Sequence, residues 1–167
     1  MKYRKANIED LDNIMTIIED GRLFLKPQQS GQWQDGYPNI DNIKDDISKG
    51  YLYAILTEDD DIASIAAFTY HEEDYDHLYE GHWISEYPYM VMHRISVKEK
   101  YRHQGYGDAL FKLFELVAKE EGYHSIRIDT HQNNKVMLHL LEKNHFILCG
   151  KAILKPNKDR LVFEKII

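Results

Sequence analysis

The segment Arg102-His103-Gln104-Gly105-Tyr106-Gly107 places two glycines among basic and polar residues, between an apolar run and a helical run. A loop that leaves a strand and opens a helix presents backbone N–H groups without partners at the positive end of the helix dipole. Such groups bind diphosphates well. Gly105 and Gly107 would let the backbone approach a ligand closely and adopt positive φ. The segment therefore predicts a pyrophosphate-binding loop.

Two other kinds of phosphate loop do not fit this segment. No Lys-Ser or Lys-Thr pair follows Gly107, so the loop is not of the nucleoside-triphosphatase type. There is no Gly-x-Gly-x-x-Gly followed by an acidic residue about twenty positions later. The loop also lies after roughly the first hundred residues, whereas a dinucleotide-binding fold uses its first strand and turn for this purpose.

The Arg-x-x-Gly-x-Gly pattern of residues 102–107, preceded by His93-Arg94-Ile95-Ser96-Val97, resembles the acetyl-CoA signature of the GNAT superfamily of acyl-CoA-dependent N-acyltransferases. Residues 129–146 resemble the family's second block, in which an asparagine opens a helix that ends in Glu-Lys-x-Gly-Phe. The resemblance implies an α/β fold with a mixed, mostly antiparallel sheet, splayed central strands and flanking helices. It also implies one N-acetyltransferase domain over residues 1–167, with acetyl-CoA as cosubstrate.

The resemblance also assigns cofactor contacts to individual positions. Backbone N–H groups of the loop would receive the pyrophosphate, two residues of the preceding strand would pair with the pantetheine, and an asparagine would contact it from a later helix. The cofactor-binding residues expected on this basis are Ile95, Val97, Arg102, His103, Gln104, Gly105, Tyr106, Gly107 and Asn134. Two alternatives stay open, namely that Arg102 is a solvated loop cation and that Asn134 is only a helix cap.

Acetyl transfer to an amine needs a base, because an alkylammonium has no lone pair at neutral pH. His93 is the leading candidate, since the unperturbed pKa of histidine is about 6.5. It precedes the strand residues expected to contact the cofactor. The alternative is a histidine packed between sheet and helix. Glu86 and His131 are weaker candidates for the base.

Transfer also requires donors for the developing oxyanion and a proton for the leaving thiolate. A bulge in the central strand would turn backbone N–H groups away from the ladder, and the N–H of Ile95 is the donor that we expect. Leu141 stands where the family's usual proton-donating tyrosine would fall, and His145 replaces the usual glycine before Phe146. Leu141 therefore keeps a second interpretation open: a degenerate member that binds acyl-CoA as a sensor or regulatory module, without turnover.

The acceptor pocket is expected in the segments that resemble the family least, residues 21–38 and 71–89. Aromatic walls with carboxylates at the rim suit a cationic amine through cation–π contact and charge attraction. The substrate contacts that we expect are Trp33, Tyr37, His71 and Trp83, and the same segments hold Asp74, Tyr75, Tyr79, Tyr87 and Tyr89. The alternative is that the acids form a solvated loop and the aromatics cover the sheet. A peptide or protein amine remains open beside a small-molecule acceptor.

Bulk composition agrees with a single domain of this kind. The chain has 167 residues, 43% of them hydrophobic and 29% charged, which suits one substantial core. The net charge of −7 argues against a nucleic-acid or anionic-membrane partner, although residues 98–104 are locally basic. The single Cys149 and the absence of an apolar leader predict a cytoplasmic protein. A homodimer is possible.

No metal is expected. The spacing of His71, His77 and His82 matches no zinc pattern, and Cys149 in an apolar strand is read as core filler rather than a nucleophile.

Apolar periodicity and turn residues predict the elements that must position these residues. Helices are expected over residues 8–19, after an Asn7 cap, and over 41–49, 105–121 and 134–143. Strands are expected over residues 2–6, 51–57, 62–70, 89–97, 125–130, 146–154 and 161–166. Residues 21–38 and 71–86 are expected to be largely irregular.

Overall fold

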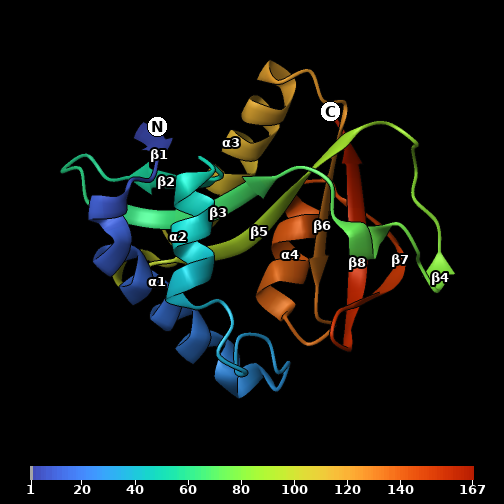
Figure 1. Ribbon diagram of the computed structural model, residues 1–167, viewed down its shortest axis with the longest axis horizontal. Coiled ribbons are helices and arrows are strands. Elements are labelled where there is room, and N and C mark those ends of the chain that lie inside the picture. The colour runs from blue at the N-terminus through green and yellow to red at the C-terminus, as the bar shows by residue number, and fades with distance from the viewer. Residues whose placement is uncertain (1) are drawn as a thin grey trace. The chain divides into compact units, whose positions relative to one another are not determined.

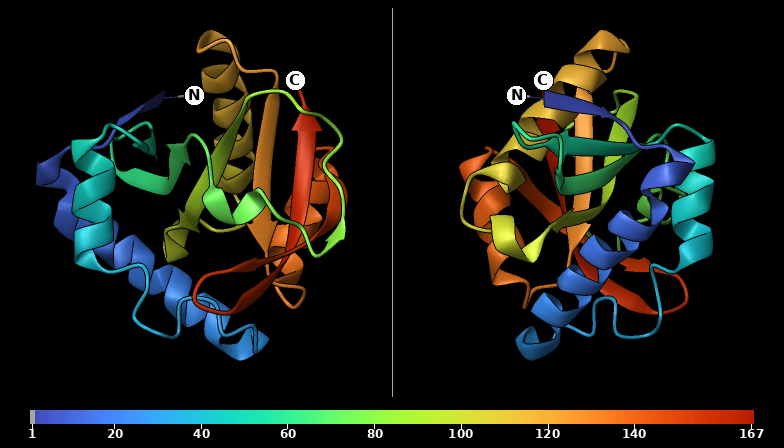
Figure 2. Two further views of the ribbon diagram at one scale, coloured as in Figure 1. Left: turned by 45° about the vertical axis from the view of Figure 1, so that its right-hand side comes forward. Right: turned by 90° about the vertical axis from the view of Figure 1, so that its left-hand side faces the viewer.

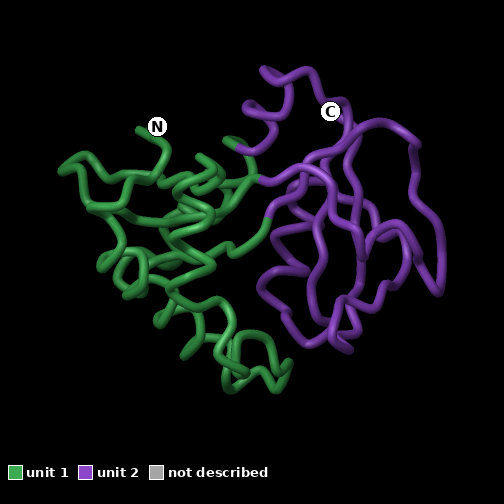
Figure 3. Tube along the Cα trace, viewed as in Figure 1, with its two compact units in different colours: residues 1–68, 93–113 green, residues 69–92, 114–167 purple. Residues whose placement is uncertain are grey.

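The computed structural model describes residues 2–167, which divide into two compact units (Figure 3). The first unit runs to Phe68 and includes His93–Leu113, and the second holds Thr69–Met92 and Phe114–Ile167. Strand β5 (Tyr89–Val97) and helix α3 (Tyr106–Glu120) each contribute residues to both units.

The first unit is built from the strands β1 (Lys2–Lys5), β2 (Leu52–Leu56) and β3 (Ile62–Thr69), which pair in antiparallel order. Two helices, α1 (Leu11–Leu25) and α2 (Ile40–Ser48), pack on this sheet (Figures 1 and 2). The core between them consists of isoleucines, leucine and alanines that are nearly unexposed: Ile14, Ile17, Ile18, Ile43, Leu52, Ala54, Ile62, Ile65 and Ala67. Burial of this apolar surface is the main force that holds the helices on the sheet.

Helix α1 differs from its predicted bounds at both ends. Asn7 does act as a cap, but of a 3-10 turn over Ile8–Asp10, and the α-helix follows it and continues past Gly21 to Leu25. Gly21 lies inside the helix, and no larger residue fits at this position. A Cβ there would lie 2.6 Å from both Ser96 Oγ and the ring of Trp33. The glycine that reads as a helix end in the sequence therefore serves close packing.

The second unit contains β6 (Ser125–Thr130), α4 (Lys135–Lys143), β7 (Ile147–Leu154) and β8 (Lys158–Ile166). Strand β8 pairs in antiparallel order with both β6 and β7, and it begins three residues earlier than the predicted strand. The loop after β3 holds a 3-10 turn, Glu73–Tyr75, whose Tyr75 packs with Val91, Ala152 and Val162. The tyrosine thereby anchors this loop to the sheet of its own unit.

A short strand that the sequence did not predict, β4 (Glu80–Gly81), lies in the same loop and pairs with β7. The pairing needs glycine on both sides. A Cβ at Gly81 would lie 2.0 Å from the carbonyl oxygen of Cys149, and one at Gly150 would lie 2.0 Å from that of Glu80. The region predicted as irregular is therefore tied to the edge of the sheet.

The strands follow the order β1-β2-β3-β5-β6-β8-β7-β4 in one eight-stranded sheet. The ladders β1–β2, β2–β3, β4–β7, β6–β8 and β7–β8 are antiparallel, whereas the ladder β5–β6 is parallel and joins Tyr89–Val91 to Ser125–Arg127. This confirms the predicted α/β fold with a mixed, mostly antiparallel sheet and flanking helices. Within the described residues, no helix combines the length and apolarity that a bilayer crossing requires.

Candidate active site

The predicted phosphate loop connects β5, through the 3-10 turn Glu99–Tyr101, to the start of α3. The backbone N–H of Ala109 donates to the Gly105 carbonyl at 3.0 Å, which marks the first bond of the helix. The N–H groups just before it have no partner within the helix, as at every helix N-terminus. Gly105 has φ of +86° and His103 φ of +62°, whereas Gly107 lies in the first helical turn, so only the first glycine has the expected positive φ.

The charges around this loop are more balanced than the sequence indicated. Asp61, at the start of β3, accepts hydrogen bonds from Lys98 at 2.9 Å and Tyr101 at 2.9 Å, and it lies 2.8 Å from the ammonium of Lys100. Lys100 and Lys98 hold the pKa of Asp61 well below its usual range. The lysines that made residues 98–104 basic in sequence thus share one carboxylate.

Arg102 is held by contacts within the protein and is not a solvated loop cation. Its Nη2 donates to the Asp20 carbonyl at 2.6 Å, and its guanidinium carbon lies 4.6 Å from the centre of the Phe24 ring. The side chain therefore fixes the loop against the end of α1. Any contribution to phosphate binding would come from the same, already positioned guanidinium.

The strand that precedes the loop has an irregularity next to the predicted base. Arg94 has φ of +54° within β5, between His93 and Ile95. A left-handed residue inside a strand is one of the conformations that β-bulges use, so the bulge expected from the chemistry stays a prediction at this position. Both His93 and Ile95 are partly exposed.

The side chain of Arg94 is held by two partners of the first unit. Its Nε and Nη2 donate to Asp46 on α2 at 2.5 and 2.6 Å, and its Nη1 donates to the hydroxyl of Tyr37 at 2.6 Å. Burial by itself lowers the pKa of Arg94, but Tyr37 and Asp46 outweigh it and raise the pKa above its ordinary value. The guanidinium is therefore a permanent cation in a fixed position.

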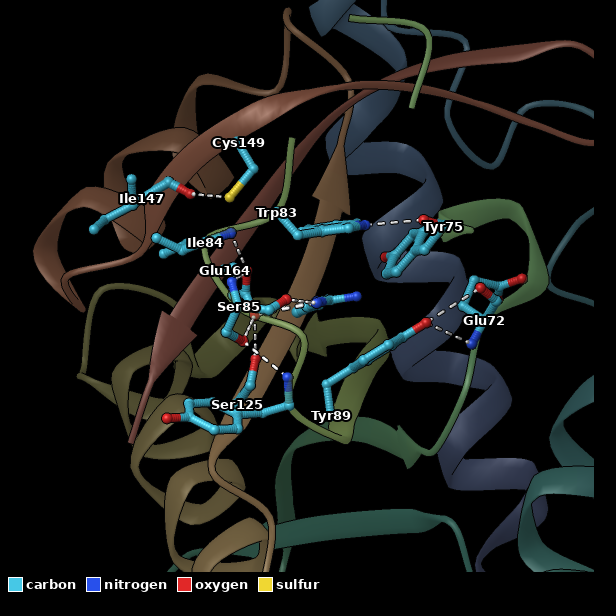
Figure 4. Close-up of polar contacts among 12 residues, drawn as sticks. Glu72, Tyr75, Trp83, Ile84, Ser85, Tyr89, Ser125, Ile147, Cys149 and Glu164 are labelled. Atoms are coloured by element: carbon cyan, nitrogen blue, oxygen red, sulfur yellow. Dashed lines mark hydrogen bonds and ion pairs between the residues drawn. The ribbon is translucent and has the colours of Figure 1, made fainter. Parts of the chain in front are cut away.

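The second unit contains a pocket of about 380 Å³. Aromatic side chains, two carboxylates and one guanidinium share its wall, which is lined by Tyr75, Asp76, His82, Trp83, Ser85, Glu86, Tyr87, Tyr89 and Arg127. Figure 4 shows Tyr75 and Trp83 side by side, with the indole N–H of Trp83 donating to the Tyr75 carbonyl at 2.9 Å. Aromatic faces and acids thus meet in one cavity, as the sequence predicted for this segment.

Arg127 is the buried cation beneath this pocket. Its guanidinium carbon lies 4.1 Å from the centre of the Trp83 ring and 3.9 Å from that of Tyr89. Its Nη2 donates to the Ser85 carbonyl at 2.8 Å and to Glu164 Oε1 at 3.3 Å. The positive charge is therefore stacked on two rings and paired with Glu164, and the wall also carries the carboxylates of Asp76 and Glu86.

Glu164, fully buried on β8, accepts hydrogen bonds from two segments of the second unit, residues 84–85 and strand β6 (Figure 4). The Ile84 N–H, the Ser85 hydroxyl and the Ser125 hydroxyl each donate to it at 2.6 Å. Burial raises the pKa of Glu164, but the bonds from Ser125 and Ser85 and the charge of Arg127 outweigh this and lower it. The carboxylate is thus an ionised anchor for the pocket loop.

The predicted acceptor residues separate into two groups. Trp83 lines the pocket, and His71 lies against two of its lining residues, with Nδ1 3.3 Å from the Tyr89 hydroxyl and Nε2 3.2 Å from Asp76. Glu86, which the sequence predicts as a weaker base, also lines the pocket. Trp33 instead packs against the core of the first unit, and Tyr37 bonds Arg94. Within the second unit, the structure brings together the candidates of residues 71–89.

Helix α4 and the residues just before it contain Asn134, Leu141 and His131, which the sequence singles out. Asn134 caps α4, its side chain accepting from the Met137 N–H at 3.2 Å, and a cofactor contact by this residue stays a prediction. Leu141 is fully buried in this helix. Burial lowers the pKa of His131, with Arg160 adding to the effect, and its Nδ1 accepts from the Asn133 N–H at 3.1 Å.

Sequence reasoning missed Arg127, Glu164 and Asp46, three charged residues that are almost fully buried. Arg127 and Glu164 interrupt apolar strands, which was the available signal, while Asp46 reads as one more acid of an amphipathic helix. Residues 2–167 contain no group of three or more His, Cys, Asp or Glu side chains placed to hold a metal ion.

The sequence matches the family model described as "Acetyltransferase (GNAT) family" over residues 18–146. The chain belongs to the GNAT acetyltransferase family. A GNAT-family acetyltransferase from Streptococcus agalactiae is 34% identical, with a TM-score of 0.88 over 99% of this chain and 95% of that one. No curated protein matches the sequence.

Two further GNAT structures share the fold at lower identity. A GNAT-family acetyltransferase from Listeria monocytogenes is 20% identical, with a TM-score of 0.76 over 99% of this chain and 94% of that one. The PaiA N-acetyltransferase of Thermoplasma acidophilum, crystallised with coenzyme A, is 17% identical, with a TM-score of 0.73 over 99% and 98%. Membership in this GNAT family assigns the chain acetyl-CoA-dependent acyl transfer in general terms.

Proposed function

We propose that this GNAT protein transfers the acetyl group of acetyl-CoA directly to a primary amine of a small molecule. The observation that carries the proposal is the left-handed Arg94 inside β5, flanked by His93 and Ile95 and followed in the chain by the loop that opens α3. In this proposal the left-handed residue marks a bulge that turns a backbone N–H toward the oxyanion of acyl transfer.

In this proposal residues 1–167 form a single catalytic domain, which the sharing of β5 and α3 by both units supports. The N–H groups at the start of α3 bind the pyrophosphate, and the main chain of Ile95 and Val97 pairs with the pantetheine. His93 takes the proton from the ammonium of the acceptor, and the Ile95 N–H stabilises the oxyanion. Because Leu141 is buried and apolar, the thiolate leaves with a proton from water, which its pKa of about 8.5 permits.

The acceptor is a cationic amine that binds the pocket of the second unit. Asp76 and Glu86 are exposed carboxylates in its wall, whereas the single guanidinium there, Arg127, is paired with Glu164. The wall thus carries two exposed acids, and the ring of Tyr87 adds a face that attracts cations.

The experiment is a thiol-release assay with acetyl-CoA over a panel of monoamines, polyamines, amino acids and short peptides, beside calorimetric titration of acetyl-CoA. We expect acceptor-dependent release that is greatest with cationic small amines. Binding of acetyl-CoA with no release above the buffer rate would favour the sensor that the apolar Leu141 leaves open. Absence of binding would contradict the phosphate-loop assignment itself.

Two variants assign roles within the proposal. His93→Ala should lower kcat with the largest deficit near neutral pH, and raising the pH should partly restore it because more of the amine is then neutral. Asp76→Asn should raise the KM of a cationic acceptor several-fold while the KM of acetyl-CoA stays constant. Tyr3→Ala, at an exposed aromatic on β1, is the control and should change neither.

A further inference from the structure

The backbone of Arg94 is unusual even among the strained residues of this chain. Within residues 2–167, seven non-glycine residues have positive φ: Gln29, Trp33, Asp60, Arg94, His103, His145 and Asn157. Six of them lie in turns, loops or helix ends, and Arg94 alone lies inside a strand. An L-residue other than glycine is unfavourable in this conformation, so the surrounding structure must hold it.

The guanidinium supplies that hold through three separate bonds. Nε and Nη2 bind both oxygens of Asp46, and Nη1 binds the hydroxyl of Tyr37. The side chains of Arg94 and Asp46 are only 13% and 4% exposed, so water competes weakly for these bonds. A planar guanidinium bound at all three of its nitrogens has almost no freedom to rotate.

The two partners are themselves positioned by neighbouring residues. Asp46 lies on α2, whose start is fixed by a capping box between Asn39 and Asn42. Tyr37 precedes that helix in a segment whose Pro38 carbonyl accepts from Arg22 Nη2 of α1 at 2.9 Å. Both helices of the first unit therefore contribute to the position of one strand residue.

We propose that Asp46 and Tyr37 are positioning residues for acyl transfer, which hold Arg94 in its left-handed conformation and thereby orient His93 and the N–H of Ile95. This inference rests on the function proposed above and extends it to residues that touch neither acetyl-CoA nor the amine. The triad Arg94–Asp46–Tyr37 is called the brace below.

The competing explanation is that the brace only attaches α2 to the sheet. Other contacts already do so, since Ile43 of α2 is fully buried in the core of the first unit. Strand β5 is also tied to α1, because the Ser96 hydroxyl donates to the Ile17 carbonyl at 2.8 Å. A brace that served attachment alone would leave the conformation of residue 94 without consequence for the rate.

A matched pair of double variants separates the two explanations. Arg94→Ala/Asp46→Asn and Arg94→Gly/Asp46→Asn both lack the ion pair and differ only in the Cβ at position 94. Glycine adopts positive φ without the clash that alanine meets. We expect the alanine variant to lose at least about 30-fold in kcat and the glycine variant to recover about fivefold of that loss, with the KM of acetyl-CoA within about twofold in both.

Two single variants bracket the effect. Tyr37→Phe removes one of the three bonds and should lower kcat about threefold to fivefold without changing the KM of acetyl-CoA. Asp45→Asn is the control, because Asp45 precedes Asp46 on α2 but is exposed and pairs with Lys49. It should leave both constants unchanged.

Equal kcat values in the two double variants would overturn the proposal, as would parental activity in both with reduced thermal stability. The backbone claim has its own readout, since the backbone chemical shifts of residue 94 report the sign of φ. Positive φ in the parent and in the glycine variant, lost in the alanine variant, supports the brace even if no amine is acetylated. That combination would reject the proposed function alone, whereas an extended residue 94 in the parent would reject the brace.

Discussion

Arg94 on β5 and Arg127 on β6 each form a buried ion pair with a carboxylate, and the hydrogen bonds around the two pairs are arranged in opposite ways. In the first unit the arginine is the residue with several partners, since Arg94 donates to both Asp46 and Tyr37. In the second unit the carboxylate collects them, since Glu164 receives donors from Ser85, Ser125 and Arg127, among others. Of the two arginines, Arg94 has a left-handed backbone and Arg127 does not.

The difference separates stability from chemistry. A buried carboxylate with many donors, such as Glu164, joins strands and a loop, and its loss leaves several polar groups unpaired at once. A buried arginine with several acceptors, such as Arg94, fixes the backbone that carries it. We therefore expect substitutions in the Glu164 pair to lower mainly the free energy of unfolding, and substitutions in the Arg94 pair to lower mainly kcat.

The largest expected effect on stability is that of Glu164→Gln. The variant leaves the buried Arg127 without its counter-ion, so the free energy of unfolding should fall by about 3–5 kcal/mol, measured by urea denaturation. Glu80→Gln, at an exposed glutamate that pairs with Lys151, is the control and should leave the midpoint almost unchanged. Equal midpoints for the two variants would refute a special role for Glu164.

Asp46→Asn should destabilise less and inactivate more. Asparagine keeps the shape of aspartate and one acceptor for Arg94, so we expect a loss of about 2–3 kcal/mol in unfolding free energy. The kcat per folded molecule should fall at least tenfold in Asp46→Asn and stay near the parental value in Glu164→Gln. A reversed order of the two kcat values would break the comparison.

The pH dependence of stability tests the second pair in the parent protein. The folded pKa of Glu164 is lowered, so its contribution is fully present above the unfolded pKa of about 4.3 and is lost as pH falls through the folded pKa. Thermal unfolding between about pH 2 and 7 should show a decline below about pH 4.3 that is shallower in Glu164→Gln. Parallel curves for parent and variant would show that other carboxylates cause the decline.

The smallest effect concerns a second left-handed residue. His145 has φ of +63° after α4, is exposed, and replaces the usual glycine of the family. His145→Gly should raise the free energy of unfolding by about 1 kcal/mol, read as a higher midpoint of thermal unfolding. Asn144→Gly, at a residue with φ of −92°, should not raise it. No gain at His145 would weaken the conformational argument applied to Arg94.

Local signals in the sequence were enough for most of the fold. Apolar alternation gave β5 and β6 with their observed bounds, and the Arg-x-x-Gly-x-Gly pattern gave the start of α3 to within a residue. The exceptions depend on contacts between distant segments. Gly21 lies within α1, where Trp33 and Ser96 leave no room for a Cβ. Strand β4 can pair with β7 because Gly150 lies opposite Gly81.

The candidate site was predicted less completely for the same reason. The aromatic and acidic pocket follows from the composition of residues 71–89, which a single pass along the chain detects. The pairing of Arg94 with Asp46 spans 48 positions, and that of Arg127 with Glu164 spans 37. Nothing in the local sequence pattern identifies such distant partners. For the same reason the sequence does not show that Trp33 packs against the core of the first unit or that Tyr37 bonds Arg94.

The most direct test of the proposed activity follows the acetyl group itself. The parent protein would be incubated with acetyl-CoA labelled with ¹³C in the acetyl carbonyl and with the best amine of the panel, and the product read by ¹³C NMR. We expect an amide carbonyl on the acceptor nitrogen, formed at the same rate as the free thiol and absent without enzyme. Release of thiol with label recovered only as acetate, or no release at all, would contradict it.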